Sequence, residues 1–225
     1  MNILVCIKQV PDTTEIKIDP VKNTLIREGV PSIVNPFDTY ALEAAARIKD
    51  ADPNAKIVVV TMGPPQAEKA LRECLAIAAD KAYLVTDRKF GGSDTIATSY
   101  VLKMTVKKLE ELEGKFDAIF CGKQAIDGDT AQVGPQVAEK LGIPQITYAE
   151  EILAVENDTI TVKRRLERGV EVVKGRLPIL VTVNGSAAAC RPRHAKLTLK
   201  YKLAKTQSEV NEIGADYTEI FSNRP

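Results

Sequence analysis

The residues best suited to chemistry lie in the loop Cys121–Pro135, which is rich in glycine, aspartate and threonine. The loop follows the β-prone run Phe116–Phe120 and precedes Gln136–Leu141, which the sequence predicts to be helical. A strand, a loop and a helix start form the place where α/β proteins hold nucleotide phosphates, because free backbone N–H groups and the positive helix end point at the ligand. The loop contains neither GxGxxG nor GxxxxGK followed by Ser or Thr, so no standard motif identifies the nucleotide.

The start of the helix after this loop has two interpretations. Asp129 would form a capping box with Gln132, but Pro135 would then fall beyond the favoured first position and remove one hydrogen bond. If Gly134 is the cap, Pro135 takes its favoured position and residues 122–133 form one long loop. In both cases several N–H groups lack helical partners, and either a phosphate or water would take them.

A second loop repeats the pattern of the first. Cys6–Asp12 and Cys121–Asp127 share the spacing C-x-K-Q-x-x-D, and each follows a predicted strand directly. In a doubly wound sheet, two such loops at the carboxyl ends of strands can flank the crevice where ligands bind. The sequence favours two loops that face one nucleotide, although a chance match of common loop residues stays open.

Other kinds of active site are poorly supported. Asp127 and Asp129 have no third hard ligand at a recognisable spacing, so the sequence predicts no metal site. His194 is the only histidine and stands between Arg193 and Lys196, where a solvated loop residue is expected. Neither a Ser-His-Asp nor a Cys-His arrangement can be built on it. The chain therefore favours chemistry carried by a cofactor, or binding alone.

The elements that position these loops alternate between strand and helix. Asn35 fits a helix N-cap, Pro36 fits the first helical position, and Asp38 stands where a capping-box acid would be. Apolar runs predict buried strands, and helical spacing predicts helices between them. The strands are expected at residues 2–7, 56–61, 82–85 and 117–120, and the helices at residues 35–48, 66–79, 96–113 and up to 141. This alternation predicts an α/β, Rossmann-like fold with a largely parallel sheet flanked by helices.

The pattern changes after residue 145. Short β-prone runs at residues 145–149, 152–155, 159–165, 170–174 and 179–183 predict an antiparallel meander appended to the parallel sheet. Residues 15–26 alternate loosely and predict a small hairpin. Residues 185–225 lack a clear period. We therefore expect a nucleotide-binding α/β domain over residues 1–185, and a recognition loop with a C-terminal arm that contacts partner subunits over residues 186–225.

Composition limits the classes of protein. The 225 residues are 44% hydrophobic and 27% charged, as in ordinary globular proteins, and no apolar run approaches a membrane span. The start Met1–Lys8 has no basic region or cleavage site, so no signal peptide is expected. The four cysteines contain no CxxC pair, which favours reduced thiols and a cytoplasmic location.

Positive charge is concentrated in one block. Residues 163–205 carry 12 lysines and arginines against 2 glutamates. Only Tyr201 supplies an aromatic ring there, so the interleaved stacking residues of nucleic-acid binding are missing. An acidic face of a partner protein and a merely solvated surface are the interpretations that stay open.

Four motifs together resemble one known family. They are Val5–Asp12, Asn35–Asp38, Thr61–Pro64 and Gly122–Pro135, and they appear in order within about residues 1–205. The chain is similar to the β subunit of electron transfer flavoprotein. The resemblance implies an α/β domain that pairs with a larger, FAD-carrying α subunit. It also implies an adenine nucleotide in this chain, which is structural AMP in ordinary members and a second FAD in electron-bifurcating members.

The resemblance also implies which residues contact the nucleotide. The run Asp-Gly-Asp-Thr-Ala-Gln-Val-Gly-Pro is similar to that of bifurcating and anaerobic members, which favours FAD over AMP. The implied nucleotide contacts are Cys6, Asn35, Pro36, Phe37, Asp38, Met62, Gly122, Lys123, Gln124, Ala125, Ile126, Asp127, Gly128, Asp129, Thr130, Ala131, Gln132 and Val133.

A recognition loop of the family docks on acyl-CoA dehydrogenases through a leucine. The segment Arg191–Leu197 takes that place, which implies partner contacts at Arg191, Arg193 and Leu197. The sequence departs from the family here, because Asn-Glu-Pro-Arg is replaced by residues 189–193 and the run of lysines is diluted. It also ends sooner than the family's C-terminal arm, so the arm's contact with the α subunit is open.

These observations predict a flavin-carrying electron-transfer subunit. NADH would donate electrons to FAD, and the electrons would divide between ferredoxin and an acyl-CoA dehydrogenase or reductase. The first alternative is a non-bifurcating subunit with structural AMP. A standalone ATP-binding sensor of the universal-stress type is a weaker alternative, because its Gly-rich phosphate pattern near the C-terminus is absent.

Overall fold

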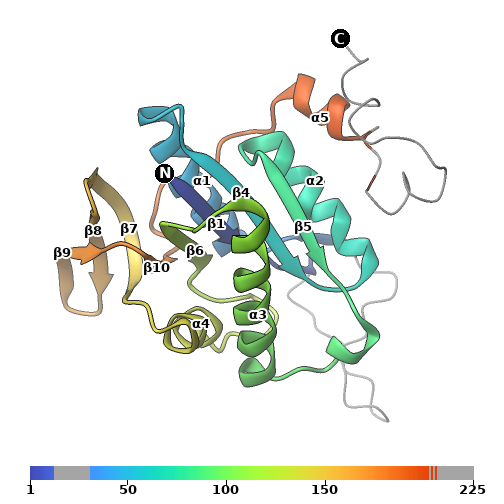
Figure 1. Cartoon of the computed structure of the whole chain (residues 1–225), viewed down its shortest axis with the longest axis horizontal. Helices are drawn as coiled ribbons and strands as arrows, with labels where there is room; N and C mark the ends of the chain where they lie inside the picture. The colour runs from blue at the N-terminus through green and yellow to red at the C-terminus, as the bar shows by residue number, and fades with distance from the viewer. Residues whose placement is uncertain (13–30, 203, 205, 207–225) are drawn as a thin grey trace.

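The centre of the molecule is an eight-stranded sheet in the order β5-β4-β1-β6-β10-β7-β8-β9 (Figure 1). The computed structural model describes residues 1–12, 31–202, 204 and 206. Neighbouring strands from β5 to β7 pair in parallel, whereas β7, β8 and β9 pair antiparallel. The strands are β1 Asn2–Cys6, β4 Lys56–Met62, β5 Lys81–Val85, β6 Ala118–Gly122, β7 Gln145–Glu156, β8 Thr159–Leu166, β9 Gly169–Arg176 and β10 Ile179–Val183.

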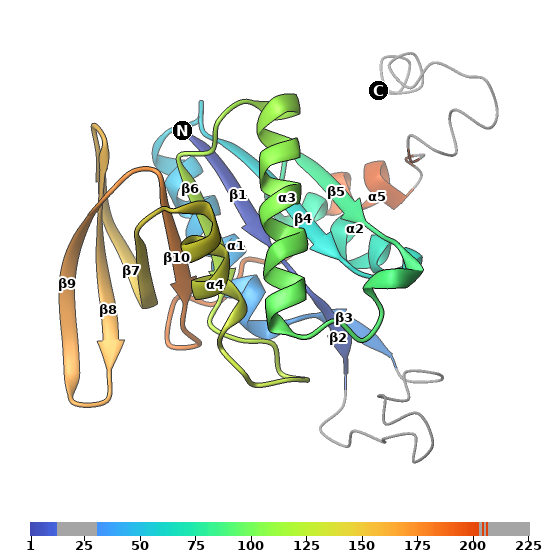
Figure 2. The same ribbon diagram turned by 60° about the horizontal axis from the view of Figure 1, so that its bottom comes forward.

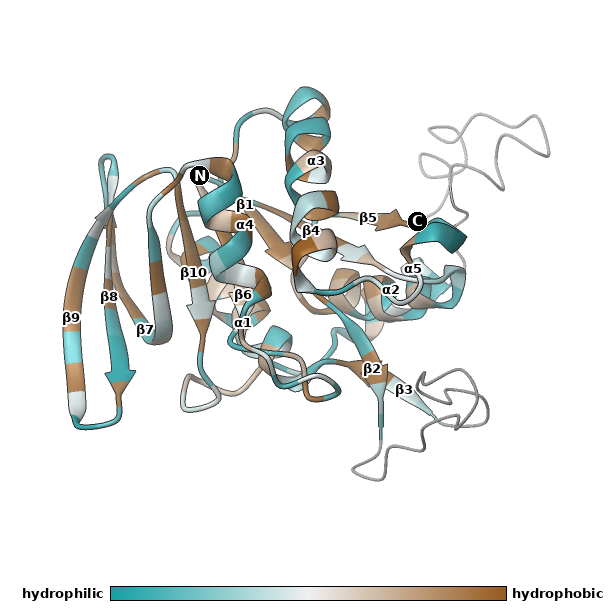
Figure 3. Ribbon diagram, turned by 90° about the horizontal axis from the view of Figure 1, so that it is seen from below, coloured by the Kyte–Doolittle hydropathy of each residue, from teal (hydrophilic) through white to brown (hydrophobic). Residues whose placement is uncertain are grey.

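Helices cover both faces of the parallel part of the sheet. Helices α1 and α2 pack on one face with Ile3 and Val5 of β1, and α3 and α4 pack on the other with Leu4. Strands covered on both faces read as continuous apolar runs, which is why the sequence predicted them correctly (Figure 3). The helices are α1 Pro36–Ala51, α2 Glu68–Ile77, α3 Thr95–Glu113, α4 Val133–Leu141 and α5 Ala195–Lys202, with 3-10 turns η1 Pro65–Ala67 and η2 Arg88–Phe90.

The strand order reverses between β1 and β6. The chain leaves β1 toward β4 and β5 on one side, and β6 and β10 lie on the other. Cys6 and Cys121 are register partners at this junction. The two loops that share C-x-K-Q-x-x-D therefore leave adjacent strands at the same edge of the sheet, where open α/β sheets bind their ligands.

The α/β fold with its antiparallel β7-β8-β9 meander agrees with the sequence prediction, but one strand was misplaced. Ile179–Val183 forms β10, which lies between β6 and β7 and pairs in parallel with both. All five of its residues are buried, and an interior position buries such a run better than a meander does. The predicted runs at 145–149 and 152–155 are one strand, β7, interrupted by register shifts and by Tyr148 at a φ of 60°.

Two smaller regions complete the fold. Strands β2 (Gln9–Pro11) and β3 (Ser32–Val34) pair antiparallel at the edge where β1 ends (Figure 2). The hairpin predicted at residues 15–26 lies outside the described residues. Residues 195–202, for which no period was found, form α5, and this helix contacts α2. Within the described ranges, no helix is long and apolar enough to cross a membrane.

Candidate functional site

The first turn of α1 lies between the two repeated loops. Asn35 takes the N-cap position and Pro36 begins the helix, as predicted, but the Asn35 side chain does not cap it. Its Nδ2 donates to the carbonyl oxygen of Gln124 at 2.8 Å, and its Oδ1 accepts from the N–H of Ile126 at 3.2 Å. The predicted capping role was therefore wrong, because the amide pairs better with a distant loop that has no helical partners of its own.

Asp38 joins the same two loops through its carboxylate. Its Oδ2 accepts from the N–H of Lys8 at 2.7 Å, and its Oδ1 accepts from the N–H of Gly122 at 3.1 Å. The capping-box role predicted for it was wrong. Burial raises the pKa of Asp38 to about 7, against the opposing effect of its hydrogen bonds from Asn35, Lys8 and Gly122. The first turn of α1 thus binds the backbone of both loops.

Gly122 permits this close approach. A Cβ at this position would lie 2.4 Å from Asp38 Oδ1 and 2.6 Å from the carbonyl carbon of Phe37. Real Cβ atoms do not tolerate such contacts with backbone. A glycine is therefore required where β6 ends, because any side chain would push the loop away from α1.

A salt bridge joins the two repeated loops directly. Lys8 Nζ lies 2.6 Å from Asp127 Oδ1, so the lysine of one loop pairs with the aspartate of the other. The corresponding lysine of the second loop, Lys123, lies 5.6 Å from the centre of the Tyr148 ring. Neither Lys8 nor Tyr148 was among the predicted site residues. The repeated lysine could have indicated Lys8, whereas nothing local in the sequence indicated Tyr148.

The end of the second loop presents backbone N–H groups. Asp129 and Ala131 have φ values of 51° and 52°, and Gln132 returns to the right-handed region. Helix α4 begins at Val133 with Gln132 at its N-cap, so neither Asp129 nor Gly134 is the cap. Within the ranges that the structure describes, the N–H groups of residues 131–133 have no acceptor. Alternating left- and right-handed residues before a helix start form an anion-binding concavity.

The start of α3 supports this loop. The Thr95 hydroxyl donates to Gln132 Oε1 at 3.1 Å, and Gln136 Nε2 donates to Thr95 Oγ1 at 3.2 Å. Asp94 caps α3 by accepting from the N–H of Ala97 at 2.7 Å. These contacts tie the side chains of Gln132 and Gln136, at the start of α4, to the first residue of α3.

The other predicted nucleotide residues lie on several sides of this edge. Cys6 and Met62 end β1 and β4, are half-buried, and pack on the side of α3 and α4. A hydrogen bond to Cys6 together with burial raises the pKa of the Cys121 thiol, which therefore stays protonated. Phe37 points the other way, toward Gly185 after β10. Among the described residues, no group of acidic, cysteine or histidine side chains could hold a metal ion.

The segment predicted to bind a partner is anchored on α1 and α2. Arg191 donates to Glu43 through Nε at 2.8 Å and to Asp50 through Nη2 at 2.6 Å. Burial opposes ionisation of Glu43, but the hydrogen bonds from Arg191 prevail and lower its pKa. The N–H of His194 donates to the carbonyl oxygen of Ala76 at 2.8 Å. Of the predicted contacts, Arg193 is exposed and Leu197 is half-buried.

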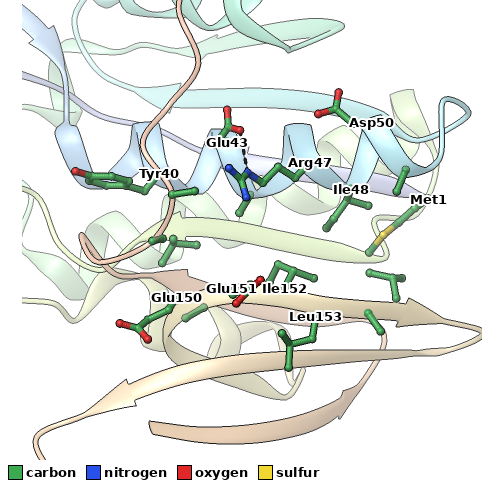
Figure 4. Close-up of a pocket in the computed structure, with 18 of the residues that line it drawn as sticks. Met1, Tyr40, Glu43, Arg47, Ile48, Asp50, Glu150, Glu151, Ile152 and Leu153 are labelled. Atoms are coloured by element: carbon green, nitrogen blue, oxygen red, sulfur yellow. Dashed lines mark hydrogen bonds and ion pairs between the residues drawn. The ribbon is translucent and has the colours of Figure 1, made fainter. Parts of the chain in front are cut away.

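A separate groove lies between α1 and β7. It has a volume of about 670 Å³, and Tyr40, Arg47, Ile152 and Leu153 are among the residues that line it (Figure 4). Arg47 pairs with Glu43 there at 3.1 Å. None of the predicted nucleotide residues lines this groove, so it is distinct from the candidate site at the ends of β1 and β6.

The fold defines a doubly wound α/β protein, and the two repeated loops leave the sheet at its strand-order reversal, where such sheets bind their ligands. The family model described as "Electron transfer flavoprotein domain" matches residues 22–216. The chain is 61% identical over 184 residues to the electron transfer flavoprotein subunit beta of Megasphaera elsdenii, covering 81% of this chain and 68% of that protein. It is 50% identical over 223 residues to the subunit beta of Thermoanaerobacterium thermosaccharolyticum, covering 99% and 82%.

A third relative belongs to a named enzyme complex. The chain is 56% identical over 182 residues to the caffeyl-CoA reductase-Etf complex subunit CarD of Acetobacterium woodii, covering 81% of this chain and 68% of that protein. With the family model matching most of the residues, the chain belongs to the electron transfer flavoprotein family, as a member of its β-subunit type.

Proposed function

We propose that this chain binds FAD in the crevice between the loops after β1 and β6 and acts in electron bifurcation. The observation that carries the nucleotide-binding part of the proposal is the row of N–H groups at residues 131–133, which have no acceptor in the described ranges and lie beside the start of α4. Such a row suits a diphosphate. The 56% identity to CarD, a subunit of a complex named for caffeyl-CoA reductase, supports a reductase of a CoA-linked substrate as the partner.

Each part of the crevice has a role in this proposal. The N–H groups of residues 131–133 would hold the diphosphate, with Asp129 and Thr130 beside them. Cys6 and Met62 would form the apolar wall on the side of α3 and α4. FAD would supply the redox chemistry by accepting a hydride from NADH and passing its electrons on singly. The protein would bind and orient the flavin and keep water from it.

The partners follow from the β-subunit type of the relatives. An α subunit with its own FAD would complete a heterodimer, and an acyl-CoA dehydrogenase or reductase and ferredoxin would accept the electrons. Residues 186–225 would provide the contacts between proteins, separately from the α/β domain at 1–185. In this arrangement Arg193 and Leu197 would face the partner, and Arg191 would hold the segment in place through Glu43 and Asp50.

A non-bifurcating subunit with structural AMP is the second candidate. The N–H groups at residues 131–133 would bind the phosphate of AMP as well as the diphosphate of FAD, since both ligands place an anion there. In that case the chain would be a scaffold and would carry no redox group itself.

The cofactor content of the heterodimer decides between these two functions. The chain is produced together with its α subunit, the complex is purified, and the nucleotides are extracted and identified by chromatography and mass spectrometry. We expect two FAD molecules per heterodimer. One FAD and one AMP would contradict bifurcation and support the scaffold. A preparation without any nucleotide bound to this chain would contradict both.

A further inference from the structure

We propose that Asn35 and Asp38 form a strap that fixes the spacing of the two ligand loops, and that neither side chain contacts the nucleotide. The inference rests on the proposed nucleotide site but changes the role of two residues in it. The family resemblance implied that both are direct contacts. The hydrogen bonds and the burial of the two residues support an indirect role instead.

All polar groups of Asn35 are already engaged inside the protein. Its side chain bonds Gln124 and Ile126 of the second loop. Its backbone N–H donates to the carbonyl oxygen of Lys8 in the first loop at 2.8 Å. Its own carbonyl oxygen accepts from Asp38 and Thr39 in the first turn of α1. With an exposed fraction of 0%, Asn35 offers a ligand no donor, no acceptor and no surface.

Asp38 is engaged in the same way. One carboxylate oxygen binds the N–H of Lys8 and the other binds the N–H of Gly122, and 6% of the residue is exposed. Both oxygens already accept from backbone donors in a residue with little exposed surface, so a nucleotide group that took the place of either N–H would leave a buried donor unpaired, at a cost of about 1–3 kcal/mol. Whenever Asp38 is ionised, it would in addition repel an anionic phosphate.

The positions of these hydrogen bonds explain what the strap does. Lys8 and Gly122 stand at the points where β1 and β6 pass into their loops, and Gln124 and Ile126 lie further along the second loop. The strap therefore binds the base of both loops and the first turn of the second. The salt bridge from Lys8 to Asp127 at 2.6 Å then joins the loops beyond the strap. The ligand loops are held in position before any ligand binds.

The test uses the full chain purified with its α subunit, stripped of nucleotide, and compares four variants. Asp38→Ala removes both acceptors, and Asp38→Asn retains one of them. Asn35→Asp keeps the acceptor for Ile126 and loses the donor to Gln124. Asp52→Asn is the matched control, because Asp52 lies at the opposite end of α1 and contacts the terminal amine of Met1. For each variant, amide hydrogen exchange is measured in the nucleotide-free complex. The release rates of FAD and of AMP are measured after each nucleotide has been added back.

We expect exchange of the Lys8 and Gly122 N–H groups to accelerate in the nucleotide-free Asp38 variants, while the amides of β4 and β10 keep their rates. Each lost hydrogen bond to a charged acceptor changes such a rate about tenfold or more. Nucleotide release should therefore accelerate about tenfold in Asp38→Asn and about a hundredfold in Asp38→Ala. In Asn35→Asp the accelerated release should accompany faster exchange around residues 124–126. A smaller effect of Asp38→Asn than of Asp38→Ala would show that the lost hydrogen-bond acceptors, and not a general loss of stability, cause the faster release.

The proposal is overturned if Asp38→Asn weakens nucleotide binding while the exchange of Lys8 and Gly122 in the nucleotide-free protein matches that of the Asp52→Asn control, since the carboxylate would then act on the ligand directly. It is equally overturned if exchange accelerates and release does not. If neither FAD nor AMP binds the unsubstituted complex, the proposed function fails, and the exchange rates in the nucleotide-free protein alone decide whether the strap holds the loops.

Discussion

Helix α1 holds the two repeated loops and the segment that follows β10 by different kinds of contact. Its first turn binds the ligand loops through Asn35 and Asp38, which are 0% and 6% exposed. Further along, Glu43 and Asp50 bind Arg191, whose side chain is 31% exposed, and that of Asp50 is 59% exposed. Buried hydrogen bonds to backbone are short-ranged and unaffected by salt, whereas partly exposed ion pairs are screened. We therefore expect salt to weaken the contacts that hold the 191–202 segment, and to leave the hydrogen bonds that hold the ligand loops unchanged.

Gly122→Ala should have the largest effect at the buried end of α1. The added Cβ would meet Asp38 Oδ1 at 2.4 Å and the backbone of Phe37 at 2.6 Å. Because backbone atoms cannot move aside easily, we expect the free energy of unfolding to fall by about 3 kcal/mol. Denaturant unfolding of the complex measures it.

Gly128→Ala provides the matched control for stability. It adds the same methyl group six residues later, where nothing lies within 4 Å of the new Cβ. We expect its free energy of unfolding to differ from that of the wild type by no more than about 0.5 kcal/mol. Equal losses for the two variants would contradict the close approach of β6 to α1.

The ionisation of Asp38 should make stability depend on pH. Burial raises its pKa from the ordinary 3.8 to about 7, so between these values the folded chain binds a proton that the unfolded chain has released. Stability that is fully present below the unfolded pKa is then lost as the pH rises through 7. Between about pH 5.5 and pH 7 this amounts to about 2 kcal/mol at about 1.4 kcal/mol per unit.

Unfolding of the wild type and of Asp38→Asn across this range measures that contribution. The variant should be less stable overall, and its slope with pH should be flatter because it has no carboxyl group to titrate. Parallel slopes for the two proteins would show that Asp38 titrates below this range, as an exposed aspartate does.

Arg191→Ala should weaken the exposed anchor more moderately. Glu43 is buried, and in the variant it keeps Arg47 at 3.1 Å as its cationic partner among the described residues. We expect the free energy of unfolding to fall by about 1–2 kcal/mol. This is less than for a fully buried pair, because solvent screens Arg191. Exchange of the His194 N–H, which bonds Ala76, should accelerate with it.

Asp50→Asn and added salt sharpen the contrast between the two ends of α1. Asp50 is the exposed partner of Arg191, and Asp50→Asn should lower the free energy of unfolding by about 0.5 kcal/mol. High salt should accelerate exchange at His194 and leave exchange at Lys8 and Gly122 unchanged. If salt changed exchange at His194 and at Lys8 and Gly122 equally, the two ends of α1 would not differ in the kind of contact they make.

The sequence predicted the features that depend on local pattern. Apolar runs located β1, β4 and β6, and the repeated C-x-K-Q-x-x-D located two loops that the structure places on adjacent strands. It could not locate partners far along the chain. Asn35 looked like a cap because its neighbours are helical, yet its amide binds Gln124, 89 residues away. An apolar run such as Ile179–Val183 indicates burial but not which strands lie beside it.

The smallest predicted difference in stability is between the two leucines of α5, Leu197 and Leu199. The family resemblance indicates Leu197 as the anchor for a partner, but Leu197 is half-buried on a helix that contacts α2, whereas Leu199 is 65% exposed. We expect Leu197→Ala to lower the free energy of unfolding by about 1 kcal/mol and Leu199→Ala to change it by less than about 0.5 kcal/mol. A greater loss for Leu199→Ala would contradict this packing of α5. With the expected order, a partner that takes up Leu197, as the resemblance implies, would have to compete with the packing of α5 on α2.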